Sequence, residues 1–218
     1  MCKKMGPIES QLLEILNSDG GERAAHRFLR KNDDIIISAF NRAWNFEVCI
    51  PEFKFGSEYR ADFLILSAHS VHWHAIFIEL KDYKTKLYSK NGNPKKALRQ
   101  AQNQIDSWRE WVRVNEPYLR QRFAAILEKE DAPAIWPHEI PNYTKGYSSG
   151  SNEIVDMKSY VDYYFHIVIG RSSTLTSEER KFRQNDMTWG GPEIATYDRL
   201  LTMARRGDEA KLAMRDNR

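Results

Sequence analysis

The sequence has little that would mark a secreted, membrane or zinc-finger protein. Only two cysteines, Cys2 and Cys49, occur in 218 residues; they are too few for a disulfide framework and lack the CxxC spacing of a zinc site. The richest apolar run, at residues 76–80, is far too short to cross a bilayer, and no apolar core follows the basic pair near the start. These absences predict a soluble, cytoplasmic protein without a membrane partner.

Two common nucleotide-binding signatures and a dominant charge are also missing. The sequence contains no P-loop and no G-x-G-x-x-G, which removes the main support for P-loop NTPases and Rossmann enzymes. Lys and Arg number 33 against 30 Asp and Glu, so the net charge of +3 permits nucleic-acid binding without requiring it. With 41% hydrophobic and 29% charged residues, the chain has ordinary globular composition.

The spacing of apolar residues predicts helices around a β-meander. Helical spacing covers residues 8–16 and, after Gly20-Gly21, residues 22–29. β-Branched and aromatic residues predict strands at 44–55, 59–66 and 71–80, whose short links suit antiparallel pairing. The expected later elements are helices from Pro94 to about Val114 and at 118–130, a strand at 160–169, a helix at 177–184, a short strand near Ile194 and a helix at 197–206.

These elements predict one main domain with short additions at both ends. The domain is expected at residues 22–206, after an N-terminal helix and extension at 1–21 and before a charged, frayed tail at 207–218. Prolines and the run Gly-Tyr-Ser-Ser-Gly-Ser predict an irregular, mobile excursion at 131–158 inside the domain.

Charged residues within apolar strands are the main candidates for chemistry. Strand alternation places Glu79 and Lys81 on one face, at the end of a strand that is apolar on both faces and therefore expected to be central. Asp62 lies among apolar neighbours on the preceding strand. A charge that enters such a core needs a partner or a metal. Two carboxylates beside a lysine suit Mg²⁺ or Mn²⁺ and phosphodiester hydrolysis, and the alternative is a plain salt bridge at a strand end.

The pattern Asp62…Glu79-Leu80-Lys81 has the form D-X(n)-E-X-K, which gains weight only because both elements are predicted strands. In that chemistry a metal lowers the pKa of its bound water, while Lys81 orients the water or stabilises the developing oxyanion. Gln104 interrupts the apolar stripe of the long helix and either supports the same site or is a core amide bonded to backbone. Glu22 lies at a helix start, where the helix dipole explains a carboxylate.

Lysines dominate the segment that follows the third strand. Between residues 81 and 96 there are six lysines and one acid, with two tyrosines interleaved. Such a run is usually a solvated loop, but its position directly after the proposed metal site favours phosphate contacts. The residues expected to bind nucleic acid are Lys84, Lys86, Lys90, Lys95 and Lys96, together with Arg171, which alternatively only ends the last core strand.

His72 and His74 are two residues apart on an expected strand, and their imidazole side chains are of a type that binds metal ions. No third ligand of matching spacing is visible in the sequence, so packed or partly exposed histidines are the better interpretation.

Several local phrases resemble the nuclease domain of Shedu anti-phage defence proteins. They are ERAAHRFL from Glu22, RADFL from Arg60, FIELK from Phe77, QIDSW from Gln104, IGR from Ile169 and TYDRLL from Thr196. The resemblance spans about residues 22–201. It implies the αβββαβ core of the PD-(D/E)XK nuclease superfamily, an α/β restriction-endonuclease-like fold with a mixed central sheet flanked by helices.

Carried over residue by residue, the resemblance implies roles for five side chains. Asp62 and Glu79 would be metal ligands, and Lys81 would be the catalytic lysine. Gln104 would support the site from its helix, and Glu22 would be an accessory acid. The implied activity is Mg²⁺- or Mn²⁺-dependent cleavage of DNA in phage defence.

The first motif departs from the superfamily pattern because Ala61 stands where a proline is usual, a change that removes no ligand. Members of the family are oligomeric, which implies a dimer or tetramer. A surplus of large aromatics suits such an interface: Trp108, Trp111, Trp136 and Trp189. Two other hypotheses stay open: a non-cleaving nucleic-acid-binding or assembly module that retains the fold, and a restriction or repair nuclease.

Overall fold

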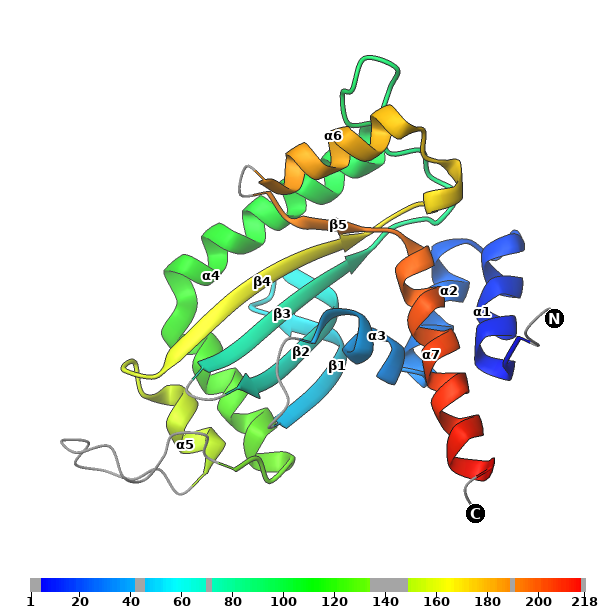
Figure 1. Ribbon diagram of the computed structural model, residues 1–218. Coiled ribbons are helices and arrows are strands. Elements are labelled where there is room, and N and C mark those ends of the chain that lie inside the picture. The colour runs from blue at the N-terminus through cyan, green and yellow to red at the C-terminus, as the bar shows by residue number, and fades with distance from the viewer. Residues whose placement is uncertain (1–4, 42–45, 70–71, 134–148, 189–190, 217–218) are drawn as a thin grey trace. The chain divides into compact units, whose positions relative to one another are not determined.

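The structure of the chain is a computed structural model that describes residues 5–41, 46–69, 72–133, 149–188 and 191–216 (Figure 1). Its helices are α1 (Pro7–Asn17), α2 (Gly21–Lys31), α3 (Asp34–Phe40), α4 (Lys96–Lys129), α5 (Gly150–Val155), α6 (Ser177–Thr188) and α7 (Tyr197–Asp216), with a short 3₁₀ helix at Ser172–Thr174. Its strands are β1 (Phe46–Phe55), β2 (Tyr59–His69), β3 (His72–Leu80), β4 (Tyr160–Val168) and β5 (Glu193–Ala195).

The five strands form one mixed sheet in the order β1-β2-β3-β4-β5. β1 and β2 are antiparallel, whereas β4 and β5 are parallel. The predicted α/β class, with helices around a mixed sheet, is therefore confirmed. β3 lies between β2 and β4 and is buried at every position from Ala75 to Leu80, so its predicted central place is also confirmed.

The chain divides into two compact units. The first comprises residues 1–39, 78–103 and 166–218, and the second comprises residues 40–77 and 104–165. β3, α4 and β4 each begin in one unit and end in the other.

An aromatic cluster fills the core of the second unit. Phe55 at the end of β1 is fully buried, and its ring centroid lies 5.3 Å from that of Trp108 and 5.4 Å from that of Trp111 on α4. Phe53 packs against Phe123 of the same helix at 6.0 Å. Trp108 and Trp111 thus pack intramolecularly, and the other two tryptophans offered as interface residues lie outside the described part of the chain.

The turn between β1 and β2 requires a glycine. Gly56 has a φ of +67°, in the region that glycine adopts without steric cost, and a Cβ there would lie 3.0 Å from the Trp111 ring. The turn joins Phe55 to Tyr59 in the first pair of the ladder. The predicted hairpin, with its turn at Gly56-Ser57, is confirmed.

α4 contains the interruption that the sequence predicts between two helices. Asn115 has non-helical angles (φ −114°, ψ 21°), and its side-chain amide donates to the carbonyl of Trp111 at 2.9 Å. Pro117, two residues later, lacks an N–H and disfavours helix before it, which explains the break. The expected start at Pro94 is wrong by two residues, because Pro94 forms an isolated bridge with Tyr88 and the helix begins at Lys96.

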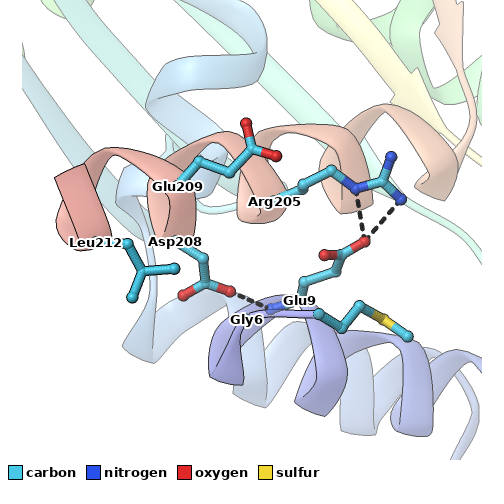
Figure 2. Close-up of a pocket in the computed structure, with 7 residues that line it drawn as sticks. Gly6, Glu9, Arg205, Asp208, Glu209 and Leu212 are labelled. Atoms are coloured by element: carbon cyan, nitrogen blue, oxygen red, sulfur yellow. Dashed lines mark hydrogen bonds and ion pairs between the residues drawn. The ribbon is translucent and has the colours of Figure 1, made fainter. Parts of the chain in front are cut away.

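In the first unit, α7 continues well past the end expected for it. The predicted frayed tail from residue 207 is wrong, because the helix extends to Asp216. α7 packs along α1, and Asp208 is buried with its carboxylate accepting the Glu9 N–H at 2.8 Å (Figure 2). Gly6, the N-cap of α1, offers no side chain, so Asp208 supplies the cap from the other helix.

The contact between α1 and α7 also contains an ion pair. Arg205 lies 2.7 Å from the carboxylate of Glu9, which is 3% exposed (Figure 2). A Cβ on Gly6 would come within 2.3 Å of Asp208, so only glycine fits at that position. Apolar periodicity does not reveal such a contact, because its partners are polar and about 200 residues apart in sequence.

The parallel pair β4–β5 carries a second buried charge cluster. His166 and Glu193 are partners in the strand register, with Nδ1 and Oε2 3.1 Å apart, and Arg199 pairs with the other oxygen of Glu193. Contact with His166, followed by the charges of His166 and Arg199, lowers the pKa of Glu193 to about 2 despite burial. The cluster ties β5 to β4 and to the start of α7.

We expect Glu193→Gln to reduce the loss in free energy of unfolding that occurs at acid pH. Because the folded pKa lies below the ordinary value of 4.5, the carboxylate contributes stability above about pH 4.5 that is lost as the pH falls towards 2. Urea unfolding at pH 7 and pH 2.5 should show a loss about 2.5 kcal/mol smaller in the variant than in the natural chain. Glu128→Gln, an exposed change on α4, serves as control; equal losses in all three proteins would contradict the assignment.

Within the described residues, no helix combines the length and the apolarity that a membrane crossing demands.

Candidate active site

Glu79 and Lys81 form a close ion pair at the end of β3. Glu79 Oε1 lies 2.5 Å from Lys81 Nζ, with the two side chains 7% and 23% exposed. The N–H of Lys81 donates to the carbonyl of Val168 at 2.8 Å, so the strand-like backbone continues one residue beyond β3. The predicted shared face is therefore confirmed, and a carboxylate almost out of water is stabilised by a cation that keeps some access to solvent.

The segment after Lys81 is fastened to the start of α2. The hydroxyl of Tyr83 donates to the carbonyl of Ser18 at 2.9 Å and accepts the N–H of Gly21 at 3.0 Å. Tyr83 is 1% exposed and packs edge-on against Tyr197. Glu22 follows Gly21 directly and is half-buried in the first turn of α2. Tyr83, two residues after Lys81, therefore holds the helix turn that contains Glu22.

Tyr83 is the residue of this site that sequence reasoning missed. Its place between lysines in an expected loop predicts a solvated side chain. Its two backbone partners are Ser18, before α2, and Gly21, the first residue of α2; both lie more than 60 residues earlier, and only the folded chain reveals them.

Asp62 is half-buried near the start of β2, in the second unit. β2 is a neighbour of β3 in the sheet. The β1–β2 register pairs Pro51 with Phe63, so Glu52 lies across from Asp62. Glu52 has a φ of +51°, in the left-handed region that is costly for a residue with a side chain. Glu52 pairs with Arg60 at 3.1 Å. The joining of Asp62 with Glu79 in one site stays a prediction.

Gln104 occupies the position on α4 that the helical spacing predicts. It is half-buried, and Ala101 and Trp108 on either side of it along the stripe are fully buried. It belongs to the second unit, so its support of the Glu79 site also stays a prediction.

The lysines after β3 are exposed, but the tyrosines between them are not. All five lysines proposed to contact phosphate have exposed side chains: Lys84, Lys86, Lys90, Lys95 and Lys96. Tyr88 is 2% exposed and packs against Phe182 of α6, with ring centroids 5.9 Å apart. The segment is therefore an anchored loop whose tyrosines serve the core rather than a platform for stacking bases.

Two of the proposed phosphate-binding residues already have acidic partners. Lys84 pairs with Asp19, and this contact lowers the pKa of Asp19 and raises that of Lys84. Arg171, 15% exposed, holds Asp198 at 3.1 Å, and Asp198 also accepts the N–H of Ser172. Arg171 therefore stabilises the start of α7, and its phosphate contact stays a prediction.

The donor chemistry at the end of β3 fits a hard divalent cation. The carboxylate of Glu79 is an oxygen ligand of the kind that Mg²⁺ and Mn²⁺ prefer, and a second one from Asp62 stays a prediction. Lys81 beside them supplies the positive charge that phosphodiester chemistry needs at the phosphate.

Within the excursion expected at 131–158, the structure describes residues 131–133 and 149–158. Ser149 caps the short helix α5, and Glu153 within that helix is fully buried. The stretch Gly146–Gly150 also matches the G-x-S-x-G pattern of serine hydrolases. Its central Ser148, like residues 134–147, lies outside the described residues, so the pattern receives no role.

A comparison with curated proteins finds no match to this chain. A comparison with family models finds one for the Shedu protein SduA, C-terminal, which matches residues 19–201. The matched range includes β2, β3 and α4, and with them Asp62, Glu79, Lys81 and Gln104. Because the match covers most of the 218 residues, the chain belongs to the Shedu SduA C-terminal family.

Proposed function

We propose that this protein is a metal-dependent DNA endonuclease that acts in anti-phage defence. The observation that carries the chemistry is the Glu79–Lys81 pair, a nearly buried carboxylate held 2.5 Å from an ammonium group at a strand end. Membership of the Shedu family supports the defensive role. A dimer or tetramer is part of the same proposal.

In this proposal Asp62 and Glu79 hold Mg²⁺ or Mn²⁺. An ion held there would supply Lewis-acid chemistry, since it would make a water molecule more acidic and would offset negative charge at the phosphate. Lys81 donates a hydrogen bond to a phosphate oxygen and stabilises the negative charge that develops when water attacks phosphorus and the P–O bond breaks. Tyr83 keeps the backbone after Lys81 in place through its bonds to Ser18 and Gly21.

The exposed lysines after β3 supply the electrostatic part of DNA binding. Lys86, Lys90 and Lys95 line one hollow of the first unit with Tyr88 and Phe182. Contacts of this kind recognise phosphate rather than sequence, and the affinity they supply falls steeply with salt. Glu178 and Glu179 also line this hollow and limit the net positive charge there.

The test is cleavage of supercoiled and linear DNA with Mg²⁺, with Mn²⁺ or with EDTA. We expect nicking or cutting by the natural chain with either metal, none with EDTA, and loss of at least about 100-fold in Asp62→Ala and Lys81→Ala. Arg113→Ala, an exposed change on α4, should retain full activity.

Gel shifts in EDTA separate binding from cleavage in the same proteins. Unchanged metal-dependent cleavage in Asp62→Ala and Lys81→Ala would show that the site is assigned wrongly. Salt-sensitive DNA binding by a natural chain that never breaks a strand would favour the non-cleaving module instead.

A further inference from the structure

Three potential metal ligands converge on one face of β3 and β4, within the second unit. His72 Nδ1 lies 3.1 Å from Asp162 Oδ2, and His74 Nε2 lies 3.9 Å from the same oxygen. All three donor atoms lie within 4.8 Å of one another. Asp162 is the third ligand that the local sequence does not reveal, because it lies about 90 residues beyond the two histidines, on the neighbouring strand β4 (Figure 1).

Tyrosine rings on both sides restrict the two imidazoles. Tyr160 stacks on His72 with ring centroids 5.2 Å apart and an interplanar angle of 14°, and Tyr164 packs edge-on against His74 at 5.6 Å. Residues 160, 162 and 164 share one face of β4 by strand alternation, so the two rings flank Asp162. Neighbours that orient metal-binding imidazoles are a recurrent part of metal sites.

We propose that His72, His74 and Asp162 bind a divalent transition-metal ion, with Zn²⁺ the best match. Two imidazole nitrogens and one carboxylate oxygen are the donor set of zinc sites that keep a position open for water. With metal–ligand distances of about 2.0–2.2 Å, a tetrahedral site needs donor atoms about 3.4 Å apart, and the observed separations require only small side-chain rotations. His72 and Asp162 are 43% and 45% exposed, which gives an ion access from solvent.

This site is separate from the one that contains Glu79. Strand alternation sets His72 and His74 on the opposite face of β3 from Glu79. The donor sets also differ, since imidazole nitrogens favour Zn²⁺ whereas carboxylate oxygens favour Mg²⁺. The two proposals can therefore fail independently.

The test is zinc binding by the untagged full-length chain after chelator treatment, measured by competition with a chromophoric chelator. We expect one high-affinity Zn²⁺ per chain and affinity at least about 10-fold lower in His72→Gln and in Asp162→Asn. Both substitutions change partly exposed side chains, and circular dichroism checks that each variant is folded. Co²⁺ in place of Zn²⁺ should give the visible absorption of a four-coordinate site, lost in both variants.

Two further variants assign the metal to this cluster. His26→Gln, which removes a histidine from α2, and Glu79→Gln should both bind Zn²⁺ as the natural chain does. No stoichiometric Zn²⁺, equal affinity in His72→Gln and the natural chain, or loss of Zn²⁺ only in Glu79→Gln would each overturn the proposal. Because the readout is binding, the result is independent of whether the protein cleaves DNA.

Discussion

Glu79→Gln is expected to slow metal-dependent DNA cleavage by at least about 100-fold while leaving the chain folded. Glutamine keeps the shape of the side chain but removes the charge that lies 2.5 Å from Lys81 Nζ, and an amide is a weaker ligand for Mg²⁺. The measurement is the rate of plasmid nicking at saturating Mg²⁺. Glu110→Gln, at an exposed glutamate of α4 paired with Arg113, should cleave as the natural chain does.

A double variant distinguishes a catalytic role of the Glu79–Lys81 pair from a role as a plain salt bridge. Removing one partner leaves the other charge largely buried, so Glu79→Gln should lower the free energy of unfolding by about 1–3 kcal/mol. Replacing both partners by apolar side chains, in Glu79→Met with Lys81→Met, should recover most of that stability without recovering cleavage. Cleavage near the natural rate in either protein would leave the pair with a structural role only.

Arg120→Met is expected to lower the free energy of unfolding by about 3–5 kcal/mol, the largest stability effect we anticipate. Arg120 is 5% exposed and binds Glu116 at 2.7 Å. It also donates to the carbonyls of Asp156 and Ser159 at 2.9 and 3.0 Å. Methionine fills similar space but donates no hydrogen bond, so Glu116 and both carbonyls lose the donor that Arg120 supplies.

The same network reaches Tyr163 of β4, whose hydroxyl donates to Glu116 at 3.1 Å. Burial, together with the charge of Glu116, raises the pKa of Tyr163, so its hydroxyl stays protonated as a donor. Without Arg120, Glu116 keeps this one neutral donor, which offsets little of the lost ion pair.

Urea unfolding measures the effect of Arg120→Met against a matched exposed arginine. Arg113 pairs with Glu110 on the surface of α4, and Arg113→Met should leave the free energy of unfolding essentially unchanged. A loss below about 1 kcal/mol in Arg120→Met would show that the network adds little. Because small domains are stable by only about 5–15 kcal/mol, the expected loss should also lower the melting temperature by several degrees.

Local patterns predicted most elements of this fold correctly. Apolar alternation and β-branched residues located the hairpin at Phe55–Tyr59 and the buried central strand that ends at Leu80. The expected helix end near Val114 and the expected new start at 118 flank the break at Asn115. The short helix α3 had no assignment, because a seven-residue segment rich in isoleucine lacks enough turns to show a helical period.

The candidate site was predictable in part. Alternation alone placed Glu79 and Lys81 on one face, and the observed ion pair agrees. The lysines of the following loop are exposed as expected, whereas Tyr83 and Tyr88 are buried because distant partners, Ser18 and Phe182, take them into the core. Composition cannot distinguish a solvated tyrosine from one that bonds to a remote backbone.

The sequence by itself determined the period of most helices and strands, the place of the acidic and basic residues on β3, and the family. These features depend on residues close together in the chain, where alternation and helical spacing act directly. Tertiary structure decided the continuation of α7 over α1, the network of Arg120 and the meeting of His72 with Asp162. The physical reason is that polar contacts over 36 to 199 residues depend on complementary donors and acceptors that only the folded chain brings together.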